Sequence, residues 1–216
     1  MENRFITIEG VDGAGKSTTI SSIKNYLESK GEDVILTREP GGTNLGDRLR
    51  SILLDHKMDL FTETLLMFGA RNEHIKEVIN PGLAENKWVI CDRFTDSTFA
   101  YQAYAKGLEV AKVKQLQSLV QENLRPGITF ILDVPLHVSR ERLAKTNKIP
   151  DKFESEKDDF FERVINGYKT LAKLDPTRCR LIDAAGTPDA TIDQVIFNLD
   201  QYYKKNNPSS ERKRKM

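Results

Sequence analysis

Residues 5–18 read FITIEGVDGAGKST, and this stretch decides the class of fold. The apolar residues 5–9 predict a buried strand, and residues 16–29 predict a helix that Gly31 ends. Between them, residues 10–17 fit the pattern G-x-x-x-x-G-K-[S/T], whose glycines let backbone N–H groups surround an anion. A strand, a glycine-rich loop and a helix in this order predict a phosphate-binding loop.

The loop residues have separate expected roles toward a bound nucleotide. Lys16 should reach the β- and γ-phosphates, and Ser17 should place its hydroxyl on Mg²⁺. The helix N-terminus adds a partial positive charge at the same point. We expect the nucleotide to contact Gly10, Val11, Asp12, Gly13, Ala14, Gly15, Lys16, Ser17 and Thr18.

Further strands and helices alternate along the chain. Short apolar runs predict strands at residues 34–37, 88–91, 129–134 and 180–183. Each run is apolar enough to be buried on both faces of a sheet. A helical pattern over residues 62–79, expected to end at Pro81-Gly82, lies between two of them. The alternation predicts an α/β fold with a parallel sheet and helices on both faces.

Asp92 directly follows the run at residues 88–91. A Mg²⁺-bound nucleotide requires a carboxylate at the end of a neighbouring strand, so Asp92 is the metal candidate, directly or through a water. A helix cap or a strand-end salt bridge is the structural alternative. Asp133 ends another apolar strand, and it stays unassigned.

Length and composition limit the class of protein. A chain of 216 residues favours one compact domain, here residues 1–205, whose core needs no disulfide or metal. It holds no run of about 18 apolar residues that would span a membrane. Because residues 1–10 show no signal-peptide pattern, we place the protein in the cytosol. Cys91, inside an apolar run, and the distant Cys179 indicate neither a disulfide framework nor a thiolate metal site.

The charge balance gives no general reason to expect nucleic-acid binding, since the net charge is +1. Basic residues concentrate in the tail at residues 206–216, which we expect to be disordered. This tail is either a solvated end or a docking arm for a polyanion. Residues 145–158 have few large apolar side chains and carry a proline, so they predict a mobile lid within about 140–158.

Further segments narrow the function. They are TREPGGT at residues 37–43, a helix with Phe68 and Arg71, and Asp92-Arg93-Phe94 running on to Thr98, Tyr101 and Gln102. With the phosphate-binding loop they closely resemble bacterial thymidylate kinases, which are P-loop enzymes of the nucleoside monophosphate kinase group. The resemblance spans about residues 3–203, and TREPGGT is its most specific element. It implies a five-stranded parallel sheet, a lid, usually a homodimer, and transfer of phosphate from Mg-ATP to dTMP.

The resemblance also implies a dTMP site with several cations, because a monophosphate is a dianion at neutral pH. Arg50, Arg71 and Arg93 are expected to hold it, since guanidinium groups bind phosphate bidentately and stay charged. A surface salt bridge is the alternative for each. Glu39, with Pro40 beside it, resembles the acid that approaches the acceptor phosphate or its Mg²⁺ through water.

Phe68 and Arg71 lie three residues apart on a helix and share a face, so the ring could stack on the base. In many family members this Phe stands four residues before the Arg, where Met67 stands here. Either Met67 or Phe68 is therefore the contact, and Phe68 as ordinary core is the alternative. Gln102, and more weakly Thr98, resemble the residues that hydrogen-bond the thymine edge.

Tyr101 is expected near the sugar, where lack of room for a 2′-hydroxyl could select deoxyribose. Asp12 has the family's position for binding the acceptor's 3′-hydroxyl, which would align dTMP with the γ-phosphate. No general base is needed, because the acceptor phosphate is already ionised.

The transition-state charge must come from the lid, because Gly13 stands where some family members carry an Arg. The candidates are Arg140, Arg142, Lys145, Lys148 and Lys152. We expect Lys152, with Lys148 or Arg142 beside it, to close over the phosphates, and Arg142 to flank the adenine near the loop at residues 183–188. A solvated charge run is the alternative. The expected catalytic set is Asp12, Lys16, Arg93, Arg142 and Lys152.

Two other functions stay open. One is a kinase for another monophosphate such as dUMP, UMP or CMP, against which TREPGGT and Gln102 argue. The other is a nucleotide-dependent switch without an acceptor, against which the acceptor-side arginines argue.

Overall fold

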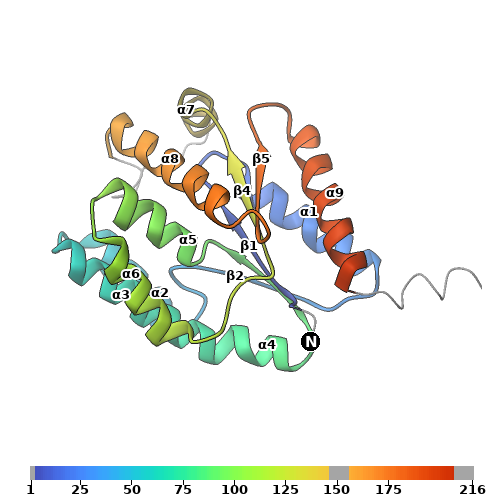
Figure 1. Ribbon diagram of the computed structural model, residues 1–216, viewed down its shortest axis with the longest axis horizontal. Coiled ribbons are helices and arrows are strands. Elements are labelled where there is room, and N and C mark those ends of the chain that lie inside the picture. The colour runs from blue at the N-terminus through green and yellow to red at the C-terminus, as the bar shows by residue number, and fades with distance from the viewer. Residues whose placement is uncertain (1–2, 146–155, 207–216) are drawn as a thin grey trace, which may run out of the picture.

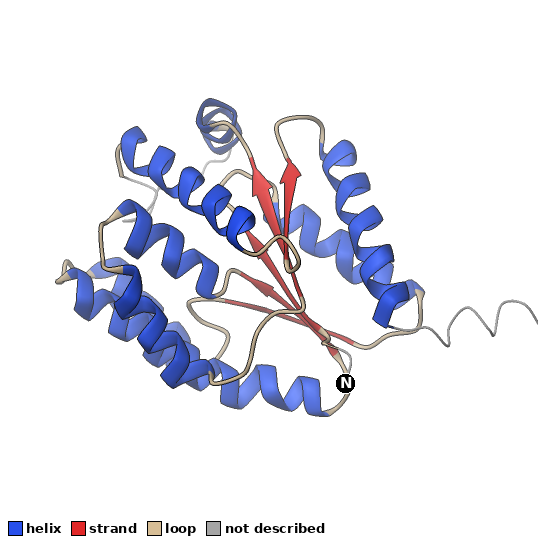
Figure 2. Ribbon diagram, in the orientation of Figure 1, coloured by secondary structure: helices blue, strands red, loops and turns tan. Residues whose placement is uncertain are grey.

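The computed structural model describes residues 3–145 and 156–206, and its sheet has five strands (Figures 1 and 2). In the order β2-β3-β1-β4-β5, their bounds are Val34–Arg38, Trp88–Asp92, Phe5–Glu9, Ile128–Asp133 and Cys179–Asp183. All neighbouring pairs are parallel, so the carboxyl ends of the strands meet at one edge. The predicted α/β fold is confirmed, and every predicted strand is correct to within one residue at each end.

Helices cover both faces of this sheet. They are α1 Lys16–Ser29, α2 Asn44–Asp55, α3 Leu60–His74, α4 Asn80–Ala84, α5 Thr95–Thr98, α6 Val110–Gln121, α7 Leu136–Ala144, α8 Asp158–Leu174 and α9 Pro188–Asn206. Two π-helical segments, η1 Ile75–Ile79 and η2 Phe99–Ala105, follow α3 and α5 directly. Figure 1 shows α1 and α9 on one side of the sheet and α3, α4, α5, α6 and α8 on the other.

The three central strands are buried more completely than the two edge strands, although Cys179 and Ile182 of β5 also belong to the core. β1 is buried along its whole length, and Ile90 and Phe130 on its neighbours are fully buried. On the edge strands, Leu36 and Leu181 are each 45% exposed. The expectation that all five strands are buried on both faces is therefore wrong for β2 and β5. Each edge strand has one neighbouring strand only, so helices cover it less completely.

The chain stays helical past the point at which Pro81-Gly82 was expected to end it. α3 begins at Leu60, where Asp59 Oδ1 caps the N–H of Phe61 at 2.8 Å, and the helix continues through η1 and α4 to Ala84. The wider π-helical turns of η1 come directly before α4, and Pro81 lies in the first turn of α4. Because a first-turn proline lacks only an N–H that needs no helical partner, it is tolerated there.

Backbone hydrogen bonds tie together the loops that leave β1, β2 and β3. The N–H of Glu39 donates to the carbonyl of Asp92 at 2.9 Å, and the N–H of Arg93 donates to the carbonyl of Ile8 at 2.9 Å. The phosphate-binding loop, the TREPGGT segment and the segment after β3 thus lie side by side at the carboxyl edge, where α/β sheets bind ligands.

Within the described residues, no helix is long and apolar enough to cross a membrane. Cys91 and Cys179 are both buried, and they form no disulfide with each other. The carboxylates and histidines of this part of the chain form no group of three that could hold a metal by themselves.

Candidate active site

The phosphate-binding loop connects β1 to α1 in the predicted position. Gly15 precedes α1 with φ of 99°, no side chain caps the helix, and its first turn has no acid. Its N–H groups are therefore open to an anion. The Lys16 side chain is folded back over the loop, with Nζ 3.3 Å from the carbonyl oxygens of both Gly10 and Val11.

Gly13 is required by the close approach of α7. Its φ is +79°, and a Cβ there would lie 2.6 Å from the carbonyl oxygen of Ser139. The Ser139 hydroxyl also donates to the carbonyl of Asp12 at 2.7 Å. An arginine therefore does not fit at Gly13 in this arrangement, and the loop contributes no side-chain cation beyond Lys16.

A cleft of about 560 Å³ opens over this loop. Its lining includes residues 12–19, Arg38, Glu39, Arg50, Asp92, Arg93, Arg142 and Thr191. Arg142 donates from Nη2 to the carbonyl of Gly186 at 2.8 Å and lies 3.4 Å from the carbonyl of Gly13 through Nη1. It therefore bridges the phosphate-binding loop and the loop at 183–188.

Asp92 fits a metal ligand in this cleft. Its Oδ1 is buried and has no hydrogen-bond partner among the described residues, and Ser17 lines the same cleft. Neither the cap nor the salt bridge considered for Asp92 is seen there. A nucleotide-bound Mg²⁺ takes only one or two protein ligands, with phosphate and water oxygens completing its shell, so this sparse donor set suits it. Asp133 instead pairs with Lys169 at 3.1 Å.

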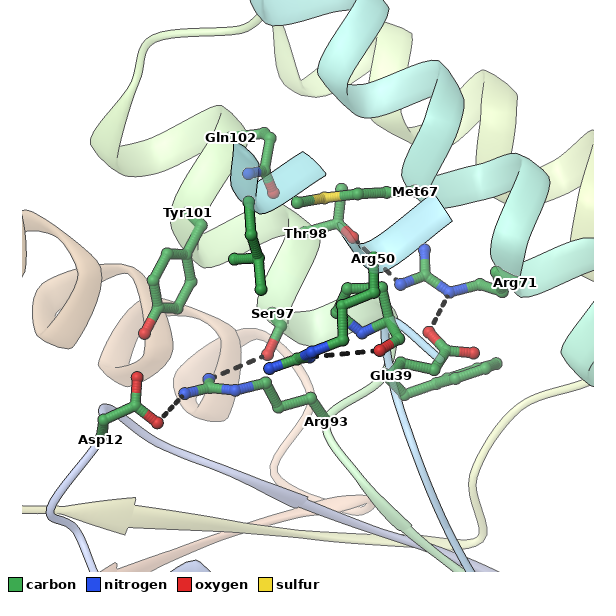
Figure 3. Close-up of a pocket in the computed structure, with 13 residues that line it drawn as sticks. Asp12, Glu39, Arg50, Met67, Arg71, Arg93, Ser97, Thr98, Tyr101 and Gln102 are labelled. Atoms are coloured by element: carbon green, nitrogen blue, oxygen red, sulfur yellow. Dashed lines mark hydrogen bonds and ion pairs between the residues drawn. The ribbon is translucent and has the colours of Figure 1, made fainter. Parts of the chain in front are cut away.

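A second cavity lies beside the cleft (Figure 3). Its lining is Asp12, Glu39, Pro40, Arg50, Leu54, Met67, Arg71, Arg93, Phe94, Ser97, Thr98, Tyr101 and Gln102. It brings together every residue predicted for the acceptor site except Phe68. Phe68 is 2% exposed and packs in the core under the Arg71 guanidinium, 4.7 Å from its ring centre, whereas Met67 faces the cavity. Of the alternatives left open by the sequence, the structure favours Met67 as the residue that faces the cavity and Phe68 as a core residue.

Four residues line both the cleft and the second cavity: Asp12, Glu39, Arg50 and Arg93. Asp12 Oδ1 accepts from Lys16 Nζ at 3.1 Å and from Arg93 Nη2 at 2.9 Å. Burial acts to raise the pKa of Asp12, but the charges of Arg93 and Lys16 outweigh burial and hold that pKa well below its usual range. Asp12 is thus an ionised link between the two cavities.

Arg71 is held by a buried carboxylate. Its Nε donates to Glu39 Oε2 at 2.7 Å, and its Nη2 donates to Thr98 Oγ1 at 3.1 Å. Glu39 Oε1 lies 2.9 Å from His74 Nδ1, so the carboxylate is fixed on both sides. Arg71 Nη1 is buried without a partner among the described residues, which leaves one donor for a ligand. Arg50 donates from Nη1 to the carbonyl of Pro40 at 3.2 Å.

Known proteins of the same kind were found by sequence and by structure. The family model described as "Thymidylate kinase" matches residues 8–195. A thymidylate kinase of Methylobacillus flagellatus is 49% identical over 204 residues, which are 94% of this chain and 100% of the relative. One of Cupriavidus pinatubonensis is 51% identical over 204 residues, or 92% of this chain and 100% of the relative. The chain belongs to the thymidylate kinase family.

A solved thymidylate kinase from Ehrlichia chaffeensis has the same fold, with a TM-score of 0.73 and 36% identity over 90% of this chain and 97% of that chain. The five-stranded sheet of this thymidylate kinase family member is accordingly that of a P-loop NTPase. The sequence resemblance to the family is confirmed.

Three residues around Arg93 were missed by the sequence analysis of this family member. Glu9 is fully buried and accepts from the Phe94 N–H at 2.7 Å, from Ser97 Oγ at 2.5 Å and from the Tyr168 hydroxyl at 3.0 Å. Burial, reinforced by the charge of Asp96, raises the pKa of Glu9 to about 7. The sequence could have indicated Glu9, because it is an acid directly before the glycine-rich loop. No sequence pattern indicated Ser97 or Tyr168.

The lid candidates divide between described and undescribed parts of the chain. Arg140 Nη2 pairs with Asp158 at 3.1 Å, and its guanidinium lies over the Phe161 ring, so Arg140 faces α8. Arg142 lines the nucleotide cleft. Lys148 and Lys152 lie outside the described residues, as does the tail from residue 207; Asn206 is the last residue of α9.

Proposed function

We infer that this protein transfers the γ-phosphoryl group of ATP to dTMP, giving ADP and dTDP. One observation carries the inference: a nucleotide cleft over the phosphate-binding loop joins a second cavity through shared residues, three of which are Asp12, Arg50 and Arg93. A switch protein needs the first cavity only. A phosphotransferase needs both, with the cations at their junction.

The junction supplies alignment and charge. Arg93 and Arg50 line both cavities, so they can hold the acceptor phosphate while facing the γ-phosphoryl group. The ionised Asp12, paired with Arg93 and Lys16, is placed for the 3′-hydroxyl of the acceptor. Phosphoryl transfer depends mainly on such positioning and charge neutralisation, and the acceptor oxygen needs no base because it is already ionised.

On the donor side, the backbone N–H groups of residues 10–18 are proposed to hold the ATP phosphates, and Lys16 to turn from its loop carbonyls toward the β- and γ-phosphates. The Ser17 hydroxyl and the unpartnered Asp92 Oδ1 are the proposed Mg²⁺ ligands. When bound, Mg²⁺ neutralises phosphate charge and orients the γ-phosphoryl group.

In the acceptor cavity, Met67 is proposed to pack on the base and Gln102 and Arg71 to read its edge. Tyr101, which is 7% exposed, packs its ring 5.3 Å from the Arg93 guanidinium and fills space beside the proposed sugar position. A 2′-hydroxyl at this position would meet the ring, so we expect the site to prefer a deoxynucleotide.

Lys152 is proposed to supply transition-state charge from the lid, with Arg142 beside the adenine. A charge that stabilises only the transition state does not contribute to substrate binding. Lys152→Ala should therefore lower kcat about 100-fold or more with little change in KM for dTMP. Steady-state kinetics with Mg-ATP and dTMP measures both constants. A kcat within about twofold of the wild type would show that Lys152 has no such role.

A homodimer working in the cytosol is the proposed state of the enzyme. Leu45 and Ile52 on α2 and Phe61 and Leu65 on α3 are 40–47% exposed, and α2 packs on α3. Exposed apolar residues on two adjoining helices suit a second copy of the chain.

The function is tested by measuring phosphoryl transfer from Mg-ATP to dTMP, dUMP, UMP, dCMP, CMP, AMP and GMP at equal concentration. Preference for dTMP is the expected result. Activity confined to another monophosphate would overturn the proposed base site, and ATP hydrolysis without any acceptor would favour a switch instead.

A further inference from the structure

α3 and the α5–η2 segment face each other across the acceptor cavity and pair in antiparallel order. At one end Arg71 Nη2 donates to Thr98 Oγ1 at 3.1 Å. At the other end Gln102 Nε2 donates to Glu63 Oε1 at 3.0 Å. Met67 lies between the two pairs on the face of α3 and lines the cavity; in Figure 3 it stands between Gln102 and Arg71. Each pair therefore borders the space proposed for the base.

Glu63 has no role in the mechanism above, although it is only 2% exposed. Its Oε1 also accepts from Lys106 Nζ at 2.7 Å, so a cation balances its charge. An ionised carboxylate has acceptors only, and the Gln102 amide can approach it only through its NH₂ group. Glu63 thus holds the NH₂ group of the Gln102 amide toward itself, and the amide oxygen faces away from Glu63.

The amide oxygen of Gln102 is the end left for the cavity. No described residue donates to this oxygen, and Gln102 lines the cavity. Arg71 Nη1 is a buried donor without a partner in the same lining. The wall thus offers one acceptor and one donor. With the Gln102 oxygen opposite position 3 of the base and Arg71 Nη1 opposite position 4, thymine and uracil match both groups through their N3–H donor and O4 acceptor. Cytosine places an N3 acceptor against the oxygen and an N4 donor against the guanidinium, so both contacts fail.

We propose that Glu63, charge-balanced by Lys106, is a positioning residue that makes the enzyme reject cytosine nucleotides by holding the Gln102 amide in one orientation. This inference rests on the proposed dTMP kinase function. Binding of the wrong base would leave buried polar groups of the site unpaired. The free energy lost in this way discriminates strongly between substrates.

Glu63→Gln tests this, because the new amide can either accept from Gln102 or donate to it. We expect the ratio of kcat/KM for dTMP to that for dCMP to fall at least about tenfold. The ratio for dTMP to dUMP should stay within about twofold, because both bases present the same edge. If all three substrates lose activity by one common factor, Glu63 is merely structural and the proposal is wrong.

The double variant Glu63→Gln/Lys106→Met covers the case in which the single variant does not fold, since removing both charges leaves no unpaired ion buried. It should show the same fall in the dTMP to dCMP ratio, and an unchanged ratio would overturn the proposal. Glu32→Gln is the matched control: it breaks the Glu32–Arg4 pair outside both cavities and should leave the ratios unchanged. Failure of the wild type to phosphorylate dTMP would instead reject the function itself.

Discussion

Arg93 is held in place by its backbone and by its side chain. Its φ of 69° is left-handed, and the bonds from its own N–H to Ile8 and from the Phe94 N–H to Glu9 hold the strand end in that form. Its guanidinium bonds Asp12 on one side and reaches the Tyr168 hydroxyl at 3.2 Å on the other. A planar, fixed cation at the junction of the two proposed phosphate sites is preorganised for charge that develops between them.

Arg93→Lys keeps the positive charge and removes the planar group. We expect kcat/KM for dTMP to fall about 100-fold, because a single ammonium cannot bond Asp12 and bind phosphate bidentately at once. Steady-state kinetics measures the loss. Arg180→Lys on β5, outside both cavities, is the control and should leave kcat/KM for dTMP nearly unchanged. An equal loss of kcat/KM in the two variants would contradict the role of Arg93.

Glu9 makes stability depend on pH. Its pKa is about 7 in the folded protein against 4.5 as the ordinary value, so the folded state binds more protons between these values. The stability that this proton uptake contributes is present below pH 4.5 and is lost as pH rises through 7. Glu9→Gln cannot ionise. Its free energy of unfolding relative to the wild type should therefore rise by about 2–3 kcal/mol from pH 5 to pH 8.

Urea unfolding at both pH values measures this difference. Glu32→Gln, whose carboxylate is paired with Arg4, serves as the control and should show no such rise. A pH-independent difference between Glu9→Gln and the wild type would mean that Glu9 is ionised throughout.

At the scale of elements, helix ends place the site residues. Gly31 ends α1 with φ of 82°, its N–H donating to the Glu28 carbonyl and the Glu32 N–H donating to that of Leu27. This pair of bonds is the Schellman motif, which turns the chain back into β2. Asp59 similarly starts α3, the helix that carries Met67 and Arg71 to the cavity.

Gly31→Ala should lower the free energy of unfolding by about 1–2 kcal/mol, since only the left-handed backbone opposes the added methyl group. Nothing lies within 4 Å of the new Cβ. Gly186→Ala has equal space without a positive φ, so it should change stability by less than about 0.5 kcal/mol. Thermal or urea unfolding compares the two variants, and equal losses would count against backbone strain as the cause.

At the scale of the molecule, apolar side chains exposed on α2 and α3 indicate where a second copy would pack. Leu65→Glu should convert a dimer to a monomer, because a buried unpaired carboxylate opposes association. Sedimentation velocity measures the change. Phe197→Glu on α9 is the control, since Phe197 is 64% exposed and Figure 1 shows α9 across the sheet from α3. A dimer that survives Leu65→Glu places the interface elsewhere.

The sequence by itself determined those features of the protein that depend on residues close together in the chain. The strand, loop and helix over residues 5–29, the positions of the other strands and three arginines that line the second cavity could all be predicted, because periodicity, glycine spacing and motif order are local properties. The end of the first helix at Gly31 could also be predicted from the sequence.

Only the tertiary structure decided which side chains meet. It turned Met67 rather than Phe68 to the cavity, placed Tyr168 on Glu9 across the fold, and set Glu63 against Gln102. It also left β2 and β5 at the sheet edges. These outcomes depend on how separate elements pack. Local sequence patterns do not predict contacts between residues that are far apart in the chain.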